Sequence, residues 1–482
     1  MLILRSLCLQ NVPMTLCILG GGVAGLAAAH YAVQSSAYGR IVLVEATSRL
    51  GGWVHTVRHR DGILYEKGPR TVRPAGAVGA NTLALVSDLG LEDRVRPVTY
   101  SHPSATNRLV LVDNKLHRLP SSLASLFKTL PPFSRPLALA ALRDLAAPRV
   151  ECEDCSLHDF VSRRLGPELA EFAVSSLVRG ICAGDSREVS VHFIARYLHQ
   201  LEQQCGRITL GVARDWLRGW LRPEVRTAEE DREIVKRARG EHWAVWGLEN
   251  GLETLVETLR DSVTRQGVEI MTDVEVDALE TDGPRLVLSA GGLQSPLTAD
   301  KVVLAVPAFQ AARLVAGVSP QLSSLLAQTP FVDVAVVNME FRGKVLDHQG
   351  FGFLVPQSQP QPLLGCIYDS CTFPQGNRTL LTVMTGGAWY QTMVGDRPAQ
   401  EVEQEMVEEV RRILNISARP VRAHTSLLPQ CIAQYTVGHT GRLRRAREEI
   451  QRSGLAIKLA GSSYDGVGIN DTIMSAKHAV IV

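Results

Sequence analysis

The chain has 482 residues, with 51 Lys or Arg against 49 Asp or Glu and 45% hydrophobic residues, so it is long enough for more than one lobe with a large core. The charged fraction of 21% is a globular value and excludes a mainly disordered or fibrous protein. The net charge of +2 argues against a dedicated nucleic-acid binder, so no nucleic-acid partner is expected, and no apolar run reaches the roughly 18 residues of a membrane-spanning helix.

The cysteines and the N-terminus indicate where the chain works. Nine cysteines is an odd number without regular spacing, which favours reduced thiols and an intracellular protein. No Asp or Glu precedes Glu45, and acid-poor N-termini suit mitochondrial import. A buried first strand and helix would give the same composition, so both interpretations stay open at this point.

The first predicted element is a strand–turn–helix–strand unit. Residues 15–20 form a short apolar run, the glycine-rich turn 20–25 follows it, and residues 26–33, rich in Ala and Leu, predict a helix. A second apolar run, residues 41–44, ends on Glu45, 20 residues after the last glycine of the turn. Such a unit places a pyrophosphate at the positive end of the helix, and the acid can accept both hydroxyl protons of an adenosine ribose. A carboxylate there repels a 2′-phosphate, which favours FAD or NAD over NADP. The alternative is a turn that only packs the helix on the strand.

Two further glycine-containing segments favour FAD over NAD. Arg49, Gly51 and Gly52 follow the second strand and offer a second backbone approach to the cofactor phosphates and the flavin. Near the C-terminus, residues 455–469 predict a strand that runs into a second glycine-bordered helix start, whose backbone N–H groups could hold negative charge at the flavin ring. Two ordinary loops are the alternative for these segments.

The remaining chain is predicted to hold a helical region, a charged tract and more strands. Residues 102–221 are expected to be helical, and residues 222–239, dense in both charge signs, form a solvated helix or loop. Strands are expected at 268–271, 274–279, 286–288 and 302–306, a mixed sheet over 332–385, an amphipathic helix over 401–414 and a last helix up to residue 482.

Several stretches beyond the glycine turn carry a specific resemblance. They are LVE at 43–45, RLGGW at 49–53, GPR at 68–70, RPAG at 73–76, NR at 107–108, RGICAGDS at 179–186, GFGFLVP at 350–356, QY at 434–435, GH at 438–439 and LAGSSYDGV at 459–467. Together they resemble the FAD-dependent amine oxidase and protoporphyrinogen oxidase superfamily, and within it the mitochondrial protoporphyrinogen oxidases of animal type. The resemblance covers nearly the whole chain.

This resemblance implies an α/β fold of mixed α+β character. It has a Rossmann-type FAD-binding domain, a mixed-sheet substrate-binding domain and an inserted helical membrane-associated domain. The expected boundaries are 14–85, 245–305 and 455–482 for the FAD-binding domain, 86–97, 222–244 and 306–454 for the substrate-binding domain, and 98–221 for the helical domain, with 1–13 as an N-terminal extension.

The resemblance also implies an activity. It is the penultimate step of haem biosynthesis, in which non-covalently bound FAD oxidises protoporphyrinogen IX to protoporphyrin IX in three two-electron steps, with O2 as acceptor and H2O2 as product. The implied location is the intermembrane-space side of the mitochondrial inner membrane, as a peripheral homodimer that passes its product to ferrochelatase.

Carried over position by position, the resemblance assigns contacts and leaves the chemistry to the flavin, so neither a catalytic side chain nor a metal is expected. The expected cofactor contacts are Gly20, Gly21, Gly22, Val23, Ala24, Gly25, Glu45, Arg49, Gly52, Trp53, Gly68, Pro69, Arg70, Thr71, Val276, Ser462, Val467, Gly468 and Ile469. The expected substrate contacts are Arg108, for a propionate, and Gly180, Phe351, Leu354 and Met384 around the ring. These residue types suit a large apolar disc with two carboxylates, although core packing, or a surface charge in the case of Arg108, explains them equally by type alone.

Three features stand outside this assignment. Cys152 and Cys155 form one CxxC without a second pair or a suitably spaced His, so a metal site is not expected there. Residues 215–222 combine Trp and Leu with Arg, which suits a helix in a lipid interface or an amphipathic helix facing the core. Residues 442–447 are expected to form a solvated helix face rather than a nucleic-acid patch.

Three other functions stay open as alternatives. An amine oxidase with a flavin-linked cysteine is disfavoured because residues 462–465 contain none, and an amine cation would need carboxylates or an aromatic cage. An NAD dehydrogenase would not need the second flavin segment. A non-enzymatic FAD-binding protein would bind flavin but would not be reoxidised by O2 after mixing with a porphyrinogen.

Overall fold

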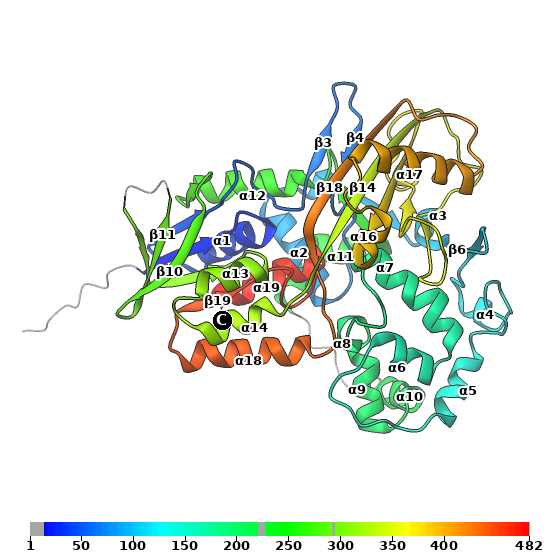
Figure 1. The fold of residues 1–482 in the computed structure, drawn as a ribbon, viewed down its shortest axis with the longest axis horizontal. Coiled ribbons are helices and arrows are strands. Elements are labelled where there is room, and N and C mark those ends of the chain that lie inside the picture. Colours follow the sequence, from blue (N-terminus) through cyan, green and yellow to red (C-terminus); the bar gives the residue numbers. More distant parts are fainter. Residues whose placement is uncertain (1–13, 220–226, 292–294, 482) are drawn as a thin grey trace, which may run out of the picture.

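The computed structural model describes residues 14–219, 227–291 and 295–481. Its first layer is a five-stranded, fully parallel sheet in the left half of Figure 1, with the strand order β19-β13-β1-β2-β9. This order brings segments from both ends of the chain into one sheet. The strands are β1 (Thr15–Leu19), β2 (Arg40–Val44), β9 (Glu269–Met271), β13 (Lys301–Leu304) and β19 (Ile457–Leu459).

Both faces of this sheet are covered, and its strands are accordingly near-continuous apolar runs. Leu16 and Ile18 of β1 pack toward one set of helices, α1 (Val23–Ser35), α12 (Glu253–Arg265) and α19 (Ile469–Ile481). Cys17 and Leu19 alternate to the other face. That face is covered by α13 (Ala308–Val315), α14 (Pro320–Ala327), α18 (His439–Arg452) and a small sheet of β10 (Val276–Asp282), β11 (Arg285–Ala290) and β12 (Leu297–Ala299).

The second layer is a seven-stranded mixed sheet in the order β18-β14-β17-β16-β15-β6-β7. All its neighbouring strands are antiparallel except β15 and β6, which are parallel. Helix α17 (Ala399–Ile413) covers one face through the buried Val402, Met406 and Val410, which recur at helical spacing. The strands are β6 (Arg108–Val112), β7 (Lys115–Arg118), β14 (Phe331–Arg342), β15 (Gly352–Leu354), β16 (Gly365–Ile367), β17 (Arg378–Gly386) and β18 (Arg422–Ala433).

Further strands and helices lie outside these two sheets. They are β3 (Thr56–Arg58) and β4 (Leu64–Glu66), α2 (Gly76–Asp88), β5 (Val95–Thr99) paired with β8 (Trp243–Leu248), α3 (Pro103–Thr106), α11 (Glu233–Gly240), α15 (Asp369–Thr372) and α16 (Tyr390–Met393).

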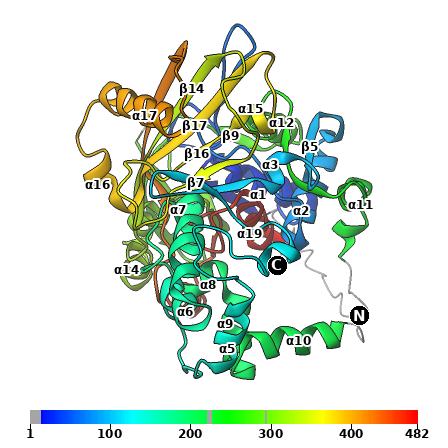
Figure 2. The ribbon, with the colours of Figure 1, turned by 90° about the vertical axis from the view of Figure 1, so that its right-hand side faces the viewer.

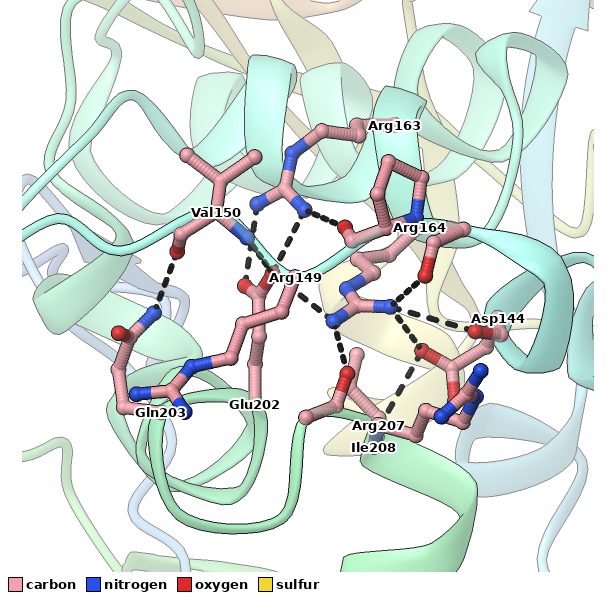
Figure 3. Close-up of polar contacts among 12 residues, drawn as sticks. Asp144, Arg149, Val150, Arg163, Arg164, Glu202, Gln203, Arg207 and Ile208 are labelled. Atoms are coloured by element: carbon pink, nitrogen blue, oxygen red, sulfur yellow. Dashed lines mark hydrogen bonds and ion pairs between the residues drawn. The ribbon is translucent and has the colours of Figure 1, made fainter.

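A helical region lies at one end of the molecule, at the lower right of Figure 1 and toward the bottom of Figure 2. Its members are α4 (Leu123–Leu126), α5 (Leu139–Ala146), α6 (Leu157–Arg164), α7 (Ser176–Cys182), α8 (Val191–Ile194), α9 (Arg196–Cys205) and α10 (Ile208–Gly219). Arg164 lies fully buried between two acids, 3.4 Å from Asp144 and 2.9 Å from Glu202 (Figure 3). Because the acids belong to α5 and α9, this network ties three helices together. Within the described residues, no helix is long and apolar enough to cross a membrane.

Most predicted elements are confirmed, and the predicted helical region is wrong in one part. Residues 108–118 are strands β6 and β7 of the mixed sheet. Asp113 and Asn114 have φ values of +50° and +58°, the left-handed pair that a two-residue hairpin turn requires, and they lie between alternating apolar positions. This local hairpin signal outweighs the general helical pattern around it. Residues 222–226 of the predicted charged tract and 220–222 of the predicted Trp/Leu/Arg stretch lie outside the described residues, and the domain boundaries remain a prediction.

Candidate flavin and substrate site

The carboxyl ends of four parallel strands meet at one edge of the first sheet. Ala305 N–H donates to the Leu19 carbonyl at 2.8 Å, and Ala460 N–H donates to the Leu304 carbonyl at 3.0 Å. The segments that leave β1, β13 and β19 are therefore neighbours, although they are hundreds of residues apart in sequence. In open parallel sheets, this edge is where ligands bind.

The glycine turn at this edge is tightly packed on its inner side and open at Gly22. Gly20 has φ +104°, and a Cβ on Gly25 would lie 1.8 Å from the Gly20 carbonyl oxygen. At Gly22, by contrast, the nearest atom to an added Cβ is Gly52 Cα at 3.9 Å, so its outer side is open. No side chain caps the N-terminus of α1, whose first turn holds the predicted contacts Val23 and Ala24. Open backbone at an uncapped helix N-terminus fits a pyrophosphate.

Glu45 is held in place at the end of β2. One carboxylate oxygen accepts the Gly21 N–H at 2.7 Å, and the other accepts the N–H and hydroxyl of Thr47 at 2.9 and 2.7 Å. Val274 N–H donates to the Glu45 carbonyl at 3.1 Å, which brings the start of β10, with Val276, to the same place. The structure thus brings together two of the predicted cofactor contacts, Glu45 and Val276.

Arg49 acts on its own loop. Its guanidinium donates to the carbonyls of Leu50 at 3.0 Å and Val54 at 3.2 Å, and also to that of Gly52. These bonds stabilise the loop against the glycine turn, where Gly51 N–H donates to Gly21 O at 2.8 Å. Its donors therefore hold backbone rather than face the open side of the turn, and a direct phosphate contact stays a prediction.

The segment after β4 joins the two sheets. A Cβ on Gly68 would lie 1.9 Å from the carbonyl oxygen of Trp53, a residue that is 41% exposed, so this backbone approach requires glycine. Arg70 forms an ion pair with Asp369 at 2.6 Å, and both side chains are largely buried. The half-buried Pro69 and Thr71 flank this arginine. The ion pair fixes the predicted flavin loop to the start of α15, next to the mixed sheet.

The loop between β19 and α19 is held by Tyr435. Its hydroxyl donates to the Ser462 carbonyl at 2.9 Å and accepts the Gly466 N–H at 2.8 Å, while its ring stacks on His439 at 3.9 Å. Burial raises the pKa of the Tyr435 phenol, so the hydroxyl stays protonated and able to donate. Val467 and Gly468 follow directly and lead into α19, which begins at Ile469.

We expect Tyr435→Phe to weaken flavin retention about tenfold, because two part-buried backbone groups of this loop lose their partner. Dissociation of FAD, followed by its fluorescence after dilution, measures this. Tyr464→Phe is the matched control in the same loop, since the buried Tyr464 hydroxyl has no hydrogen-bond partner among the described residues. Equal FAD retention in the two variants would contradict a role for Tyr435 in holding the loop.

Strand alternation places three predicted substrate contacts on one face of the mixed sheet. Leu109, Phe353 and Val383 point to the face covered by α17. Arg108, Leu354 and Met384 follow or precede them by one residue and so point to the opposite face. Leu354 pairs with Gly365, which pairs with Met384, so a glycine strand position separates these two side chains.

Gly180 and Phe351 lie beside this face. A Cβ on Gly180 would approach Leu354 Cδ2 to 2.7 Å, which shows that α7 packs directly over that side chain. Phe351 N–H donates to the Asn107 carbonyl at 3.1 Å, next to Arg108. The structure therefore places Arg108, Leu354 and Met384 on one face of the mixed sheet, Gly180 against Leu354, and Phe351 beside the residue that precedes Arg108.

A second arginine near Arg108 was missed by the sequence prediction. Desolvation and then the positive charge of Arg73 lower the pKa of the Arg108 guanidinium. Within the described residues, neither side chain forms an ion pair, and Asn470 at the start of α19 donates to the Arg73 carbonyl at 2.9 Å. Arginines that form no ion pair with an acid of the described residues suit a ligand with carboxylates. The available signal was the RPAG stretch at 73–76, which was used for the resemblance but not for a role.

The fold and this site define a member of the flavin-containing amine oxidoreductase family, and the chain belongs to it: the family model matches residues 23–480. The residues at the sheet edge fit FAD in their open glycine turn and strand-end acid.

Individual proteins also match the chain over nearly its full length. The chain is 41% identical over 474 residues to protoporphyrinogen oxidase of Bos taurus, covering 96% of this chain and 97% of that protein. It is 40% identical over 476 residues to protoporphyrinogen oxidase of Homo sapiens, covering 97% and 98%. Among solved structures, one assigned as a protoporphyrinogen oxidase from Exiguobacterium sp. 255-15 matches with a TM-score of 0.77 and 26% identity over 97% of this chain and 98% of that one. Cyclohexylamine oxidase of Brevibacterium oxydans shares the fold, with a TM-score of 0.66 and 16% identity over 97% and 98%.

Proposed function

We propose that this chain is an FAD-dependent oxidase that converts protoporphyrinogen IX to protoporphyrin IX, the penultimate step of haem biosynthesis, with O2 as electron acceptor and H2O2 as product. The observation that carries the proposal is the identity of 40% or more over nearly the full length to protoporphyrinogen oxidases of two mammals. The substrate loses six electrons, so three two-electron turnovers are needed for each molecule.

The residue types on this face of the mixed sheet suit the substrate. The macrocycle is a large apolar disc, and the face that carries Leu354 and Met384, bordered by Phe351, supplies apolar walls. Its two propionates need cations at one edge, and Arg108 with Arg73 provides them. Gly180 lets α7 approach Leu354 without a side chain in between.

FAD supplies the two-electron oxidation when it is bound. The protein's own residues would bind and orient the cofactor: the turn at 20–25 would hold the pyrophosphate, Glu45 the ribose, and the loop that Tyr435 stabilises the flavin end. The arginines orient the macrocycle by its propionates. This division of roles needs no side-chain nucleophile.

Anaerobic mixing of the purified yellow protein with protoporphyrinogen IX tests the function directly. We expect the flavin absorption to bleach and, once air is admitted, porphyrin fluorescence to rise. Coproporphyrinogen III, which carries four carboxylates, and putrescine are the comparison substrates, because relatives named for these two kinds of compound share the fold. A flavin that bleaches only with the amine would establish an amine oxidase instead, and one that bleaches with none would reject an oxidase role.

We also propose the setting that the resemblance implied. The chain is a homodimer on the intermembrane-space face of the mitochondrial inner membrane and passes its product to ferrochelatase. Support for a membrane surface comes from large apolar side chains exposed on adjacent helices of the helical region. They are Leu123 (80% exposed), Phe127 (73%), Leu142 (63%), Trp216 (64%) and Leu217 (60%), on or next to α4, α5 and α10.

We expect the double variant Phe127→Glu, Leu142→Glu to lose at least about tenfold of its binding to anionic phospholipid vesicles, because two side chains that enter the apolar boundary become charged. Cosedimentation with the vesicles measures it. The control is Leu427→Glu, which charges a 41% exposed leucine on β18, outside the helical region. If the wild-type protein does not sediment with vesicles, or if all three proteins sediment equally, the helical region is not the membrane-binding surface.

A further inference from the structure

A CxxC pair and a histidine come together in the helical region, away from the proposed flavin and substrate site. Cys152 and Cys155 lie in the loop before α6, and His199 lies on α9. One potential ligand atom from each lies within 4.8 Å of the other two, and Cys152 Sγ is 3.6 Å from His199 Nε2. The sequence could not predict this cluster, because the histidine is 44 residues after the second cysteine and only the packing of α9 brings it back.

We propose that Cys152, Cys155 and His199 bind one zinc ion with tetrahedral geometry, the fourth position being taken by water. Two thiols and one neutral imidazole form a donor set that zinc prefers over the oxygen-binding cations. In a tetrahedral site with Zn–S of about 2.3 Å and Zn–N of about 2.0–2.1 Å, a sulfur and a nitrogen ligand lie about 3.6 Å apart. The spacing of Cys152 and His199 is therefore already that of two zinc ligands.

The residue between the cysteines holds the loop in place. Asp154 accepts the Cys155 N–H at 2.9 Å and the Ser190 hydroxyl at 2.6 Å with one oxygen, and the Gly438 N–H at 2.7 Å with the other. Its carboxylate is thereby committed to the backbone around the site. Both thiols are presented to the histidine by a loop whose conformation does not depend on the metal.

The same loop is fixed to α9 just beyond the histidine. Val150 N–H donates to Glu202 at 3.2 Å, and Gln203 donates to the Val150 carbonyl at 2.9 Å (Figure 3). Glu202 is itself held by Arg163 and Arg164. Since His199 lies one turn earlier on this helix, the buried ion network positions it relative to the cysteines.

A second histidine orients the proposed ligand. His192 Nε2 lies 3.3 Å from His199 Nδ1. If His199 carries its proton on Nδ1 and donates it to His192, its Nε2 lone pair faces Cys152 Sγ at 3.6 Å and the Gln203 side-chain amide at 3.4 Å, and a metal would replace both contacts. Histidine ligands in zinc sites ordinarily donate their second N–H in this way.

Zinc binding at this site requires no oxidant or reductant. The two thiols lose their protons as two Zn–S bonds form, His199 contributes a lone pair, and the protons go to solvent, so no electrons are transferred. Half-buried cysteines leave a path for the ion. Because the site joins the loop at 152–155 to α9, zinc stabilises the helical region rather than taking part in the oxidation.

Binding of cobalt to the holoenzyme, with its cysteines present as free thiols and its flavin oxidised, tests the proposal. We expect one equivalent of Co2+ to give the ligand-field bands of tetrahedral cobalt in the red, where oxidised flavin does not absorb, and added zinc to remove them. The bands should be absent in Cys152→Ser and Cys155→Ser and retained in Cys205→Ser, the control cysteine at the end of α9. His192→Ala should weaken zinc binding about tenfold or more.

Thiol mapping decides the matter even if the serine variants fail to fold. In the wild-type protein, zinc should protect Cys152 and Cys155, but not Cys205, from alkylation, and a chelator should restore their reaction. Cobalt bands that persist in Cys155→Ser would overturn the proposal. An alkylation pattern that is the same with zinc and with chelator would also overturn it, and the contact would then be only a thiol–imidazole hydrogen bond. A Cys152–Cys155 disulfide in place of two thiols would overturn it as well.

Discussion

Arg108→Ala is expected to raise KM for protoporphyrinogen IX about 10- to 100-fold, because a charged hydrogen bond to a propionate contributes about 1.5–3 kcal/mol. The arginine is at the first position of β6, on the sheet face that also carries Leu354 and Met384. It binds the substrate's edge and leaves the reacting carbons to the flavin, so kcat at saturation should fall less than KM rises. Porphyrin fluorescence under air measures both constants.

Arg118→Ala is the matched control for this experiment. Arg118 lies on the neighbouring strand β7, paired with Leu109, so its side chain points to the opposite face of the same sheet. Its KM should stay at the wild-type value. Arg73→Ala should also raise KM, and the Arg108→Ala, Arg73→Ala double variant should lose less than the sum of the two effects if both arginines bind the same substrate. An unchanged KM in Arg108→Ala, with FAD still bound, would exclude the propionate assignment.

The parts of the site that sequence predicted best are those encoded by local pattern. The glycine turn, the helix after it and Glu45 belong to one continuous unit of about thirty residues, and backbone geometry alone relates them. The substrate face could not be derived in this way. Leu354 and Met384 meet only because β15, β16 and β17 are adjacent in a sheet, and by residue type both would be assigned to an ordinary core.

Groups that hold the site in place are harder still to predict. Tyr435 and Asp369 touch the flavin loops from elements of the mixed sheet, far along the chain from the glycine turn. Nothing in their local sequence marks a role in positioning a loop, and that role becomes visible only in the contacts that the folded chain makes. The same holds for His199 in the proposed zinc site. Its distance in sequence from Cys152 and Cys155 follows no known ligand spacing, so only the fold brings it to the two cysteines.

Arg70→Ala should have the largest effect on the folded protein. Removing one partner of a buried ion pair leaves the other charge without compensation, which costs roughly 3–5 kcal/mol. Among the described residues, Asp369 would retain only the hydrogen bond from the Thr382 hydroxyl, which donates to its second oxygen at 2.6 Å. Because Arg70 lies in the segment that contains Gly68 and Thr71, we expect the loop to detach from the mixed sheet and bound FAD to be lost. Thermal unfolding and the flavin content after gel filtration measure the two effects.

The loss of folding stability in Arg70→Ala, relative to the wild-type protein, should also increase with pH. Glu66 lines the same small cavity as Arg70 and Asp369. Burial raises the Glu66 pKa from 4.5 to about 7, while Arg70 lowers it and Asp369 raises it. A carboxyl with a raised folded-state pKa stabilises the fold below its unfolded value, and that stability is lost as pH rises through about 7. Without the guanidinium this pKa rises further, so the difference from wild type should be smallest near pH 5 and largest above pH 7.

Two comparisons separate this mechanism from a general loss of charge. Arg96→Ala breaks the half-exposed pair with Glu249, and exposed pairs contribute only about 0–1 kcal/mol, so this variant should keep its FAD. Arg70→Lys keeps the charge but not the planar guanidinium, and it should recover part of the stability. If the ion pair holds the cofactor loop to the mixed sheet, Arg70→Ala should lose both thermal stability and bound FAD, and Arg96→Ala should lose neither. Arg70→Ala that unfolds and releases flavin no more readily than Arg96→Ala would therefore show that the ion pair with Asp369 does not hold this loop.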